Sequence, residues 1–322
     1  MILTLTLNPA IDMNYRLDKL LMDQVNRCEQ VGKTPGGKGL NVTRVLQCAD
    51  EPVCATGFLG GKTGEFISEE LGKRGIRNSF VSIAGNTRHC LAIMHEGNQT
   101  EILEGGPTIS EEEADAFLRH YEVLLDKADV VTASGSLPKG LKPNFYQKLI
   151  ERAREKGKPF LLDTSGESLF EGIKARPALI KPNQDELAAL IGRPLANEEE
   201  IIDTVKHLAE ESGIDYVMVS LGKNGVIGCC NGVLYKAVPP KMKTVNPVGS
   251  GDSMIAGFAY AISRNEPLER VLAYGVTFGT LNAMEDKTGF IDSEQIVPFL
   301  MRVEISHYRE EEKFNDGNAT TI

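Results

Sequence analysis

The chain has 322 residues, of which 41% are hydrophobic and 25% are charged, which is the composition of a globular protein with one large core. Its formal net charge is −10, whereas proteins that bind nucleic acids or anionic membrane surfaces need dense positive charge. We therefore expect neither as a partner. An anionic small molecule would need a local cluster of Lys and Arg side chains.

The first apolar run, ILTLTL at 2–7, predicts a buried strand. It has no basic flank and meets Asn8 and Pro9 too early for a signal peptide or a membrane span. The six cysteines form no C-x-x-C pair, and the five histidines show no metal-ligand spacing. We therefore expect neither disulfides nor a zinc site, and a cytoplasmic location.

Strand-like and helix-like segments alternate along the chain. Amphipathic patterns that predict helices follow several of the strands, and Ser110 with Glu113 predicts a capping box. The alternation predicts one α/β domain over 1–322, with a mostly parallel sheet, helices on both faces and ligands beyond the carboxyl ends of the strands. The predicted strands lie at 2–7, 52–58, 129–134, 159–163, 178–182 and 215–222.

Two segments interrupt this alternation. Residues 13–33 contain no convincing helix, and about 88–104 read as a hairpin with a turn at Glu96-Gly97. We expect these segments to form a discontinuous β flap, or lid, over the strand ends; an ordinary edge hairpin is the alternative. The polar tail at 305–322 is expected to fray.

Two glycine-rich turns could bind a ligand, whereas GFLGGKT at 57–63 fails as a P-loop because Thr56 stands where its first glycine is required. In PGGKGLN, residues 35–41, the glycines let the backbone approach a ligand closely. In NPVGSGDS, residues 246–253, the turn amides could hold a phosphoryl group while Asp252 accepts a proton from a hydroxyl. Asp252 could equally cap the following helix.

Together, GGKGLNVTRVL at 36–46 and NPVGSGDSMIAGF at 246–258 resemble the two signatures of the PfkB (ribokinase-like) family of carbohydrate kinases. The resemblance covers nearly the whole chain and is nearest to the ketohexose-phosphate kinases that act on tagatose 6-phosphate or fructose 1-phosphate. It implies a ribokinase-like fold. Asn246, Pro247 and Ser250 replace the Asp, Thr and Ala of the usual second signature, which leaves substrate and monovalent-cation preference open. Further similar stretches are TLNPAID, SGSLPKGL, KPNQDEL and SLGKNG.

The resemblance assigns expected roles residue by residue. Asp252 is the expected catalytic base. The expected anion hole is Gly249, Ser250 and Gly251. The expected sugar-phosphate contacts are Asp12, Arg27, Gly37, Lys38, Asn41, Arg88 and Ser136. The expected nucleotide contacts are Lys181, Asn183, Ser220, Gly222, Gly225 and Asn282, with Glu186 as the Mg²⁺ ligand.

Each role has a structural alternative. Asn183 is also a suitable N-cap for the helix that follows it, and Gly222 to Gly225 could be a plain hairpin turn. Asp12 could cap a loop.

The function implied is an ATP- and Mg²⁺-dependent kinase that converts tagatose 6-phosphate to the 1,6-bisphosphate, with fructose 1-phosphate and fructose 6-phosphate as alternative substrates. Expected partners are the sugar phosphate, ATP and a second copy of the chain bound through the flap. A nicotinamide-dependent dehydrogenase would need G-x-G-x-x-G after the first strand, where Asn8-Pro9 stands. A sugar-phosphate sensor without activity would normally lose its base, yet Asp252 is present.

Overall fold

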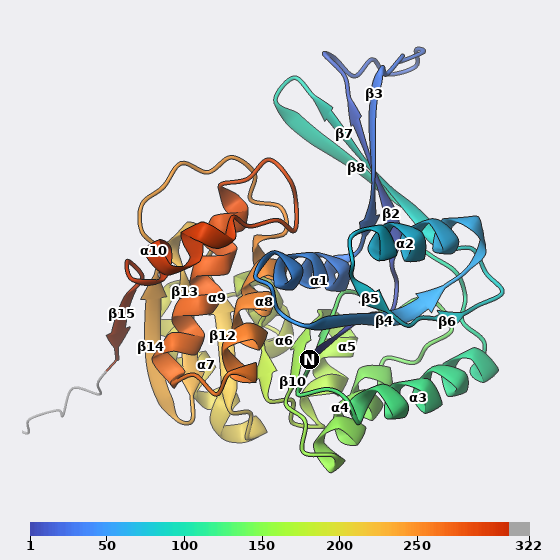
Figure 1. Ribbon diagram of the computed structural model, residues 1–322. Coiled ribbons are helices and arrows are strands. Elements are labelled where there is room, and N and C mark those ends of the chain that lie inside the picture. The colour runs from blue at the N-terminus through green and yellow to red at the C-terminus, as the bar shows by residue number, and fades with distance from the viewer. Residues whose placement is uncertain (309–322) are drawn as a thin grey trace, which may run out of the picture.

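The computed structural model describes residues 1–308, in which an eleven-stranded sheet forms the centre of the molecule (Figure 1). The strand order is β15-β14-β13-β12-β11-β10-β9-β1-β4-β5, with β6 paired to β4. All strand pairs from β12 to β5 are parallel, whereas β13, β14 and β15 extend the sheet as antiparallel strands. The six strands predicted from the sequence correspond to β1, β4, β9, β10, β11 and β12. The strands are β1 (Ile2–Thr6), β4 (Val53–Leu59), β5 (Arg77–Asn78), β6 (Val81–Ser82), β9 (Val130–Ser134), β10 (Phe160–Asp163), β11 (Leu179–Ile180), β12 (Tyr216–Ser220), β13 (Val226–Cys230), β14 (Val233–Val238) and β15 (Glu304–His307).

Helices cover both faces of this sheet, as the alternation of elements predicts (Figure 1). The predicted capping box is present, since Ser110 Oγ accepts the Glu113 N–H at 3.2 Å and Glu113 Oε2 accepts the Ser110 N–H at 2.8 Å. The helices are α1 (Lys38–Cys48), α2 (Gly61–Lys73), α3 (Glu111–Leu125), α4 (Phe145–Glu155), α5 (Gly166–Ile173), α6 (Gln184–Ile191), α7 (Glu198–Ser212), α8 (Ser250–Ser263), α9 (Leu268–Ala283) and α10 (Ile296–Leu300), with 3₁₀ turns at Gly222–Asn224 and Ser293–Gln295.

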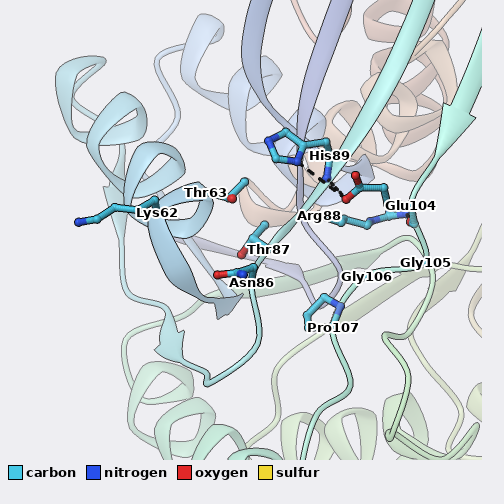
Figure 2. Close-up of a pocket in the computed structure, with 10 residues that line it drawn as sticks. All are labelled: Lys62, Thr63, Asn86, Thr87, Arg88, His89, Glu104, Gly105, Gly106 and Pro107. Atoms are coloured by element: carbon cyan, nitrogen blue, oxygen red, sulfur yellow. Dashed lines mark hydrogen bonds and ion pairs between the residues drawn. The ribbon is translucent and has the colours of Figure 1, made fainter.

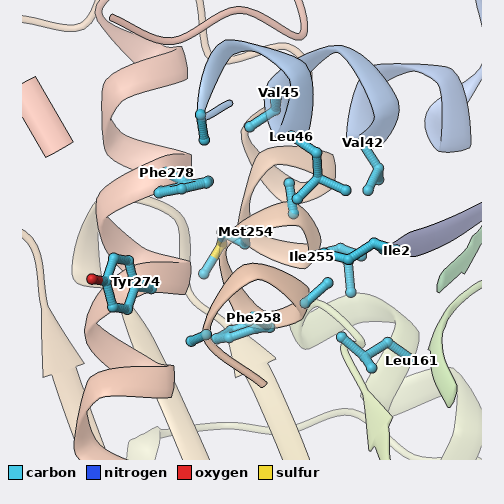
Figure 3. Close-up of a cluster of buried hydrophobic side chains, with 14 of the residues drawn as sticks. Ile2, Val42, Val45, Leu46, Leu161, Met254, Ile255, Phe258, Tyr274 and Phe278 are labelled. Atoms are coloured by element: carbon cyan, nitrogen blue, oxygen red, sulfur yellow. The ribbon is translucent and has the colours of Figure 1, made fainter. Parts of the chain in front are cut away.

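Two apolar cores lie on opposite faces of the sheet, because side chains alternate along a strand. Ile2 of β1 belongs to one core and Leu3 to the other. Figure 3 shows the first core, where Leu46 of α1, Phe258 of α8 and Phe278 of α9 meet. All three side chains are fully buried, and truncating such a phenylalanine to alanine typically costs about 3–5 kcal/mol. This packing holds the amino ends of α1 and α8 in fixed positions.

A separate four-stranded sheet, in the order β3-β2-β7-β8, projects from the core at the top of Figure 1. Its parts are the two segments from which the sequence predicts a flap. The hairpin between β7 and β8 turns at Glu96 and Gly97, whose φ values of 49° and 77° are those of a two-residue hairpin loop. We call this sheet the flap. Its strands are β2 (Ala10–Arg16), β3 (Gln30–Gly36), β7 (Arg88–His95) and β8 (Asn98–Leu103).

The tail differs from the expectation at its start. Residues 304–307 form β15, which pairs with β14 along the edge of the main sheet, so the chain is ordered beyond residue 305. Partly buried Ile305 packs against the core, and Tyr308 Oη donates a 2.7 Å hydrogen bond to Glu198. The rest of the predicted tail, 309–322, lies outside the described residues.

Candidate active site

The glycine-rich turn of the second signature leads directly into α8. Gly249 is the N-cap of this helix with φ 83°, and a Cβ atom there would lie 2.6 Å from Thr288 Cγ2, so only glycine suits the position. Ser250, Gly251 and Asp252 form the first turn. Within residues 1–308 no side chain caps this end of the helix, but the Ser250 N–H donates to the Pro247 carbonyl oxygen at 3.2 Å, so Ser250 can join the predicted anion hole only if that N–H changes its partner.

Asp252 lies at the centre of the site and is only 6% exposed. Asn41 Nδ2 of α1 donates a 2.6 Å hydrogen bond to Asp252 Oδ2, so the two signatures meet here. Burial is the main cause that raises the pKa of Asp252 to about 6, and the nearby carboxylate of Asp163 raises it further. A carboxyl group with this pKa is ionised at neutral pH and can accept a proton from a hydroxyl.

Three more charged groups surround Asp252. Asp163, at the carboxyl end of β10, is 1% exposed; its carboxylate lies 3.4 Å from Lys181 Nζ and 3.9 Å from Lys38 Nζ. Asp163 is the main cause that raises the pKa of Lys38, with smaller contributions from Asp252 and Glu186. Two ammonium groups thus stand beside the start of α8, where they would attract the phosphates of a nucleotide.

Asp12 of β2 lies at the base of the flap, and the backbone N–H of Gly37 donates a hydrogen bond to its carboxylate. Burial raises the pKa of Asp12 to about 6, against the opposing charges of Arg44 and Arg88. Asp12 and Asn41 both line a cleft of about 1160 Å³ between the flap and the core. The predicted sugar-binding carboxylate and amide thus share one cavity, and the Asn41 amide also contacts Asp252.

Arg88, at the start of β7, donates to the backbone oxygens of Glu104 at 2.8 Å and Asn8 at 3.1 Å, while its buried Nε has no partner within residues 1–308. Its side chain lines a second cavity of about 620 Å³, shown in Figure 2 together with His89 and Lys62. Since Arg88 also acts electrostatically on Asp12, it stands between this cavity and the flap base.

Two predicted sugar-phosphate residues lie at the margin of the site or away from it. Ser136 is exposed and accepts a 3.4 Å hydrogen bond from Asn8 Nδ2 near the flap base. Arg27 is exposed on the loop between β2 and β3, and this loop lies at the end of the flap away from the core, at the top of Figure 1. The structure therefore does not bring Arg27 together with Asp252.

Three of the predicted nucleotide residues, Asn183, Ser220 and Gly222, lie close together at the amino end of α6. Asn183 Oδ1 accepts the Glu186 N–H at 2.8 Å and Glu186 Oε2 accepts the Asn183 N–H at 2.9 Å, so the capping alternative is realised. Asn183 pairs with Ser220 through an isolated parallel bridge, and Gly222 begins the 3₁₀ turn that ends at Gly225. A cavity of about 550 Å³ is lined by Asn183, Ser220 and Gly222.

Asn282 has a position that the sequence did not indicate. It is fully buried in α9; its Nδ2 donates to the Val248 carbonyl oxygen at 2.9 Å, and its Oδ1 accepts the Gly289 N–H at 2.8 Å. With both ends of its amide bound to backbone groups, it has no exposed atom for an adenine. Its place differs from the expectation, because it supports the glycine turn instead.

A magnesium ion would need ligands beyond those of the chain. In the part of the chain that the structure describes, no group of three or more His, Cys, Asp or Glu side chains could hold a metal ion. Glu186 uses Oε2 in its capping box, which leaves Oε1 as a carboxylate ligand. Since Mg²⁺ commonly takes one or two carboxylates and completes its coordination with water and phosphate oxygens, this donor set suits it when a nucleotide is bound.

Sequence reasoning missed two residues of the site. Asp163 ends the predicted strand at 159–163, and an acid at the carboxyl end of a parallel strand is a signal that could have identified it. Arg44 lies inside the first signature, in a helix pattern that gave no sign that its side chain turns inward. Its burial depends on tertiary packing.

No helix within residues 1–308 is long and apolar enough to cross a membrane.

Comparison with known proteins connects this site to one family. Residues 4–295 match the model of the pfkB family of carbohydrate kinases. A putative phosphofructokinase from Staphylococcus aureus is 30% identical with a TM-score of 0.83, and the alignment covers 97% of this chain and 100% of that one.

Two further structures are similar over nearly the same extent. Phosphofructokinase-2 from Escherichia coli, in complex with potassium, is 28% identical with a TM-score of 0.87 and coverage of 94% and 98%. A possible 1-phosphofructokinase from Thermotoga maritima is 26% identical with a TM-score of 0.86 and coverage of 96% and 100%. The match spans most of the chain and includes both signatures that meet at Asp252, so the chain belongs to the pfkB family of carbohydrate kinases and is a phosphotransferase that acts on a sugar hydroxyl.

Proposed function

We propose that this chain transfers the γ-phosphoryl group of ATP to the free primary hydroxyl of a ketohexose monophosphate, giving a bisphosphate and ADP. The observation that supports it is the buried Asp252 carboxylate, bonded to Asn41, at the uncapped start of α8 beside the flap cleft. Our first candidate substrate is tagatose 6-phosphate, which would give tagatose 1,6-bisphosphate. The reason is that the second signature resembles that of the kinases acting on this sugar phosphate.

In the proposed reaction the hydroxyl oxygen of the sugar attacks the γ-phosphorus, and the bond from that phosphorus to the bridging oxygen of ADP breaks. Asp252 takes the hydroxyl proton. The amides of Gly249, Ser250 and Gly251 hold the charge that develops on the phosphoryl oxygens. Mg²⁺, with Glu186 as one ligand, would supply further neutralisation of the phosphate charge.

The sugar and nucleotide ends of the reaction fall on different sides of Asp252. Asp12, Gly37 and Asn41 offer an acceptor carboxylate, a bare backbone and an amide for sugar hydroxyls, and Asp12 and Asn41 line the flap cleft. Lys38 and Lys181 stand near the reacting phosphate. We place the nucleotide near Asn183, Ser220 and Gly222, which line a cavity at the amino end of α6, with Gly225 just after the 3₁₀ turn beside it.

The descriptions of similar structures support two further candidate substrates. Similar structures are described as phosphofructokinases, one of them as a possible 1-phosphofructokinase and another as a complex with fructose-6-phosphate. In the furanose form, ketohexose 1- and 6-phosphates place a phosphate and a free CH₂OH at opposite ends of the ring, so one pocket could accept either. Fructose 1-phosphate is therefore our second candidate and fructose 6-phosphate our third.

An ADP-release assay with the three sugar phosphates tests the proposal. We expect kcat/KM to be highest for tagatose 6-phosphate, with no comparable release for unphosphorylated hexoses. A chain that binds a sugar phosphate without releasing ADP would be a sensor, and the proposal would be wrong. The same assay with KCl replaced by a large organic cation shows whether a monovalent cation is needed, which the potassium complex of one relative suggests.

We also propose a homodimer through the flap. Val31 and Ile102 lie on one face of the flap, 43% and 54% exposed, and an apolar face of this kind can bind a second copy. A relative, phosphofructokinase-2 from Escherichia coli, is described in a tetrameric form. Sedimentation of the parent and of Ile102→Glu tests the proposal, since only the parent should exceed the mass of one chain. We also propose that the protein is located in the cytoplasm.

A further inference from the structure

We propose that Arg44 is a positioning residue for the catalytic base: its guanidinium fixes the side-chain amide of Asn41 in the orientation that donates to Asp252. The inference rests on the proposed function, in which Asp252 removes the hydroxyl proton. Arg44 does not need to touch the sugar or the nucleotide to act in this way.

The contacts of Arg44 define the arrangement. Its side chain is 8% exposed and lies in the wall of the flap cleft. Nη2 donates to Asn41 Oδ1, and the same nitrogen lies 3.4 Å from the Thr288 carbonyl oxygen. Nη1 donates to the Pro35 carbonyl oxygen. The guanidinium is thus held by backbone groups of the flap strand β3 and of the 286–290 loop.

A guanidinium carries only donors, so it selects the oxygen of the neighbouring amide. With Asn41 Oδ1 facing Arg44, Asn41 Nδ2 must face Asp252, to which it donates at 2.6 Å. A flipped amide would direct Oδ1 at the carboxylate, an arrangement that favours protonated over ionised Asp252. Arg44 therefore keeps the hydrogen bond that favours the proton-accepting form.

The position of the guanidinium is closely determined. A Cβ atom at Gly289 would lie 3.0 Å from Arg44 Nη2 and 3.1 Å from the Cα of Asn41, so glycine leaves the space that both residues occupy. Both residues belong to α1, one turn apart, and their side chains meet over the helix surface. A shift of the 286–290 loop would consequently move Arg44 and, through it, the amide of Asn41.

Few charged or titratable groups face Asp252 and Arg44. Asp252 faces Asp163 of β10, Lys38 of α1 and Lys181 after β11. Arg44 faces Asp12 of β2, Arg74 at the end of α2, Cys48 of α1 and Asp252 itself.

Burial lowers the pKa of Arg44 to about 10, so Arg44 stays charged below that value. Between pH 5 and 8 its charge is constant, and the pH profile reports the acidic groups of the site.

The test is the pH dependence of kcat for Arg44→Met, measured by ADP release with a saturating sugar phosphate. Loss of the guanidinium removes both a favourable charge and the constraint on Asn41, and both changes raise the pKa of Asp252. We expect the pKa that governs the acidic limb of the kcat profile to rise by about one pH unit. Relative to the parent, kcat should then be about fivefold lower at pH 6 and much less reduced at pH 9.

Two variants separate positioning from general structural support. Arg264→Met is the matched control, because Arg264 at the end of α8 binds Glu51, just after α1, and so joins the same two helices away from the site. It should lower thermal stability without moving the acidic limb. Arg44→Lys keeps the charge but not the planar fork, so a folded Lys variant should show a smaller shift than Arg44→Met.

A double-mutant cycle with Asn41→Ala tests the route of the effect. If Arg44 acts through the Asn41 amide, Arg44→Met should shift the acidic limb less in the Asn41→Ala background than in the parent, because only the loss of its charge then remains. Fully additive shifts would overturn the route through Asn41. An unchanged acidic limb in folded Arg44→Met and Arg44→Lys would overturn the inference, and so would a raised KM for the sugar phosphate with an unchanged kcat profile, which marks a direct ligand contact.

The results that would disprove the proposed function differ from those that would disprove the role of Arg44. In that case the parent chain itself would release no ADP with any sugar phosphate, or Asp252→Asn would retain most of the activity. The Arg44 inference fails only where the parent and the Asp252 variant behave as proposed and the Arg44 variants keep the profile of the parent.

Discussion

Asn282 Nδ2 donates a 2.9 Å hydrogen bond to the backbone oxygen of Val248, which joins the end of α9 to the turn just before Asp252. Because Asn282 is fully buried, Asn282→Ala leaves the Val248 and Gly289 backbone groups without partners, and we expect a loss of about 1–3 kcal/mol in unfolding free energy together with a lower kcat. Urea unfolding and steady-state kinetics check this. An adenine contact would instead raise KM for ATP and leave stability unchanged.

Asp252→Asn tests the base directly. The amide keeps the size of the carboxyl group but cannot accept the hydroxyl proton, so turnover should fall at least about a hundredfold while the fold and ATP binding persist. Activity within tenfold of the parent would return Asp252 to a helix-capping role. Nucleotide binding measured by calorimetry serves as the control for folding.

The same substitution should change how stability depends on pH. The folded-state pKa of Asp252, about 6, lies above the unfolded value of 3.8, so the folded state binds more protons between these values. The burial cost of the carboxylate is thus fully present above pH 6 and disappears as pH falls toward 4. We expect Asp252→Asn to be more stable than the parent at pH 8, by up to about 3 kcal/mol, with the difference falling below about 1 kcal/mol at pH 4. Equal pH dependence of the two proteins in urea unfolding would contradict the raised pKa.

Arg88→Ala should weaken the binding of the sugar phosphate and leave the binding of ATP unchanged. A lost charged hydrogen bond costs about 1.5–3 kcal/mol, so KM for the sugar phosphate should rise about tenfold or more, with KM for ATP nearly unchanged. Arg119→Ala, an exposed arginine of α3, is the control and should change neither constant. Equal weakening of both substrates would mean that Arg88 only ties the flap to the core through Asn8 and Glu104.

The sequence predicted the main sheet well because its strands carry local signals. ILTLTL and PFLLD became β1 and β10, and the capping pair Ser110 and Glu113 formed as expected. The hairpin of β13 and β14 was not predicted, since VIGCC offers no polar alternation. A strand buried on both faces resembles any apolar run.

The site was harder to predict where side chains act over long distances in the sequence. The two signatures predict that Asn41 and Asp252 belong to one site, and the structure brings the two side chains into hydrogen-bonding contact. Asn282 was misplaced, because no local pattern reveals which face of a buried helix meets a turn 34 residues away. Arg44 was overlooked because its burial depends on Pro35 of β3 and on the loop at Thr288, whereas Asp163, at the carboxyl end of β10, had a sequence signal that was not used.

The last prediction is that the flap closes over the cleft when sugar phosphate binds. The flap consists of two segments, 13–33 and 88–104, and each carries one of the arginines predicted to contact the sugar phosphate, Arg27 and Arg88. Arg88 lies at the base of the flap and Arg27 on the loop at its far end, so a phosphate bound by Arg88 is the contact that would favour the closed state. Closure would exclude water, which would otherwise compete with the sugar for the γ-phosphoryl group.

Amide hydrogen exchange measures this closure. Protection across 13–33 and 88–104 should rise with saturating sugar phosphate and not with ATP alone, and ATP hydrolysis without sugar should be slow but measurable. The strands of the main sheet, such as β1 and β9, serve as internal controls because their buried hydrogen bonds should exchange equally slowly in all samples. If exchange in both flap segments is the same with and without sugar phosphate, the flap is a static sheet, and the exclusion of water must come from the core side of the cleft.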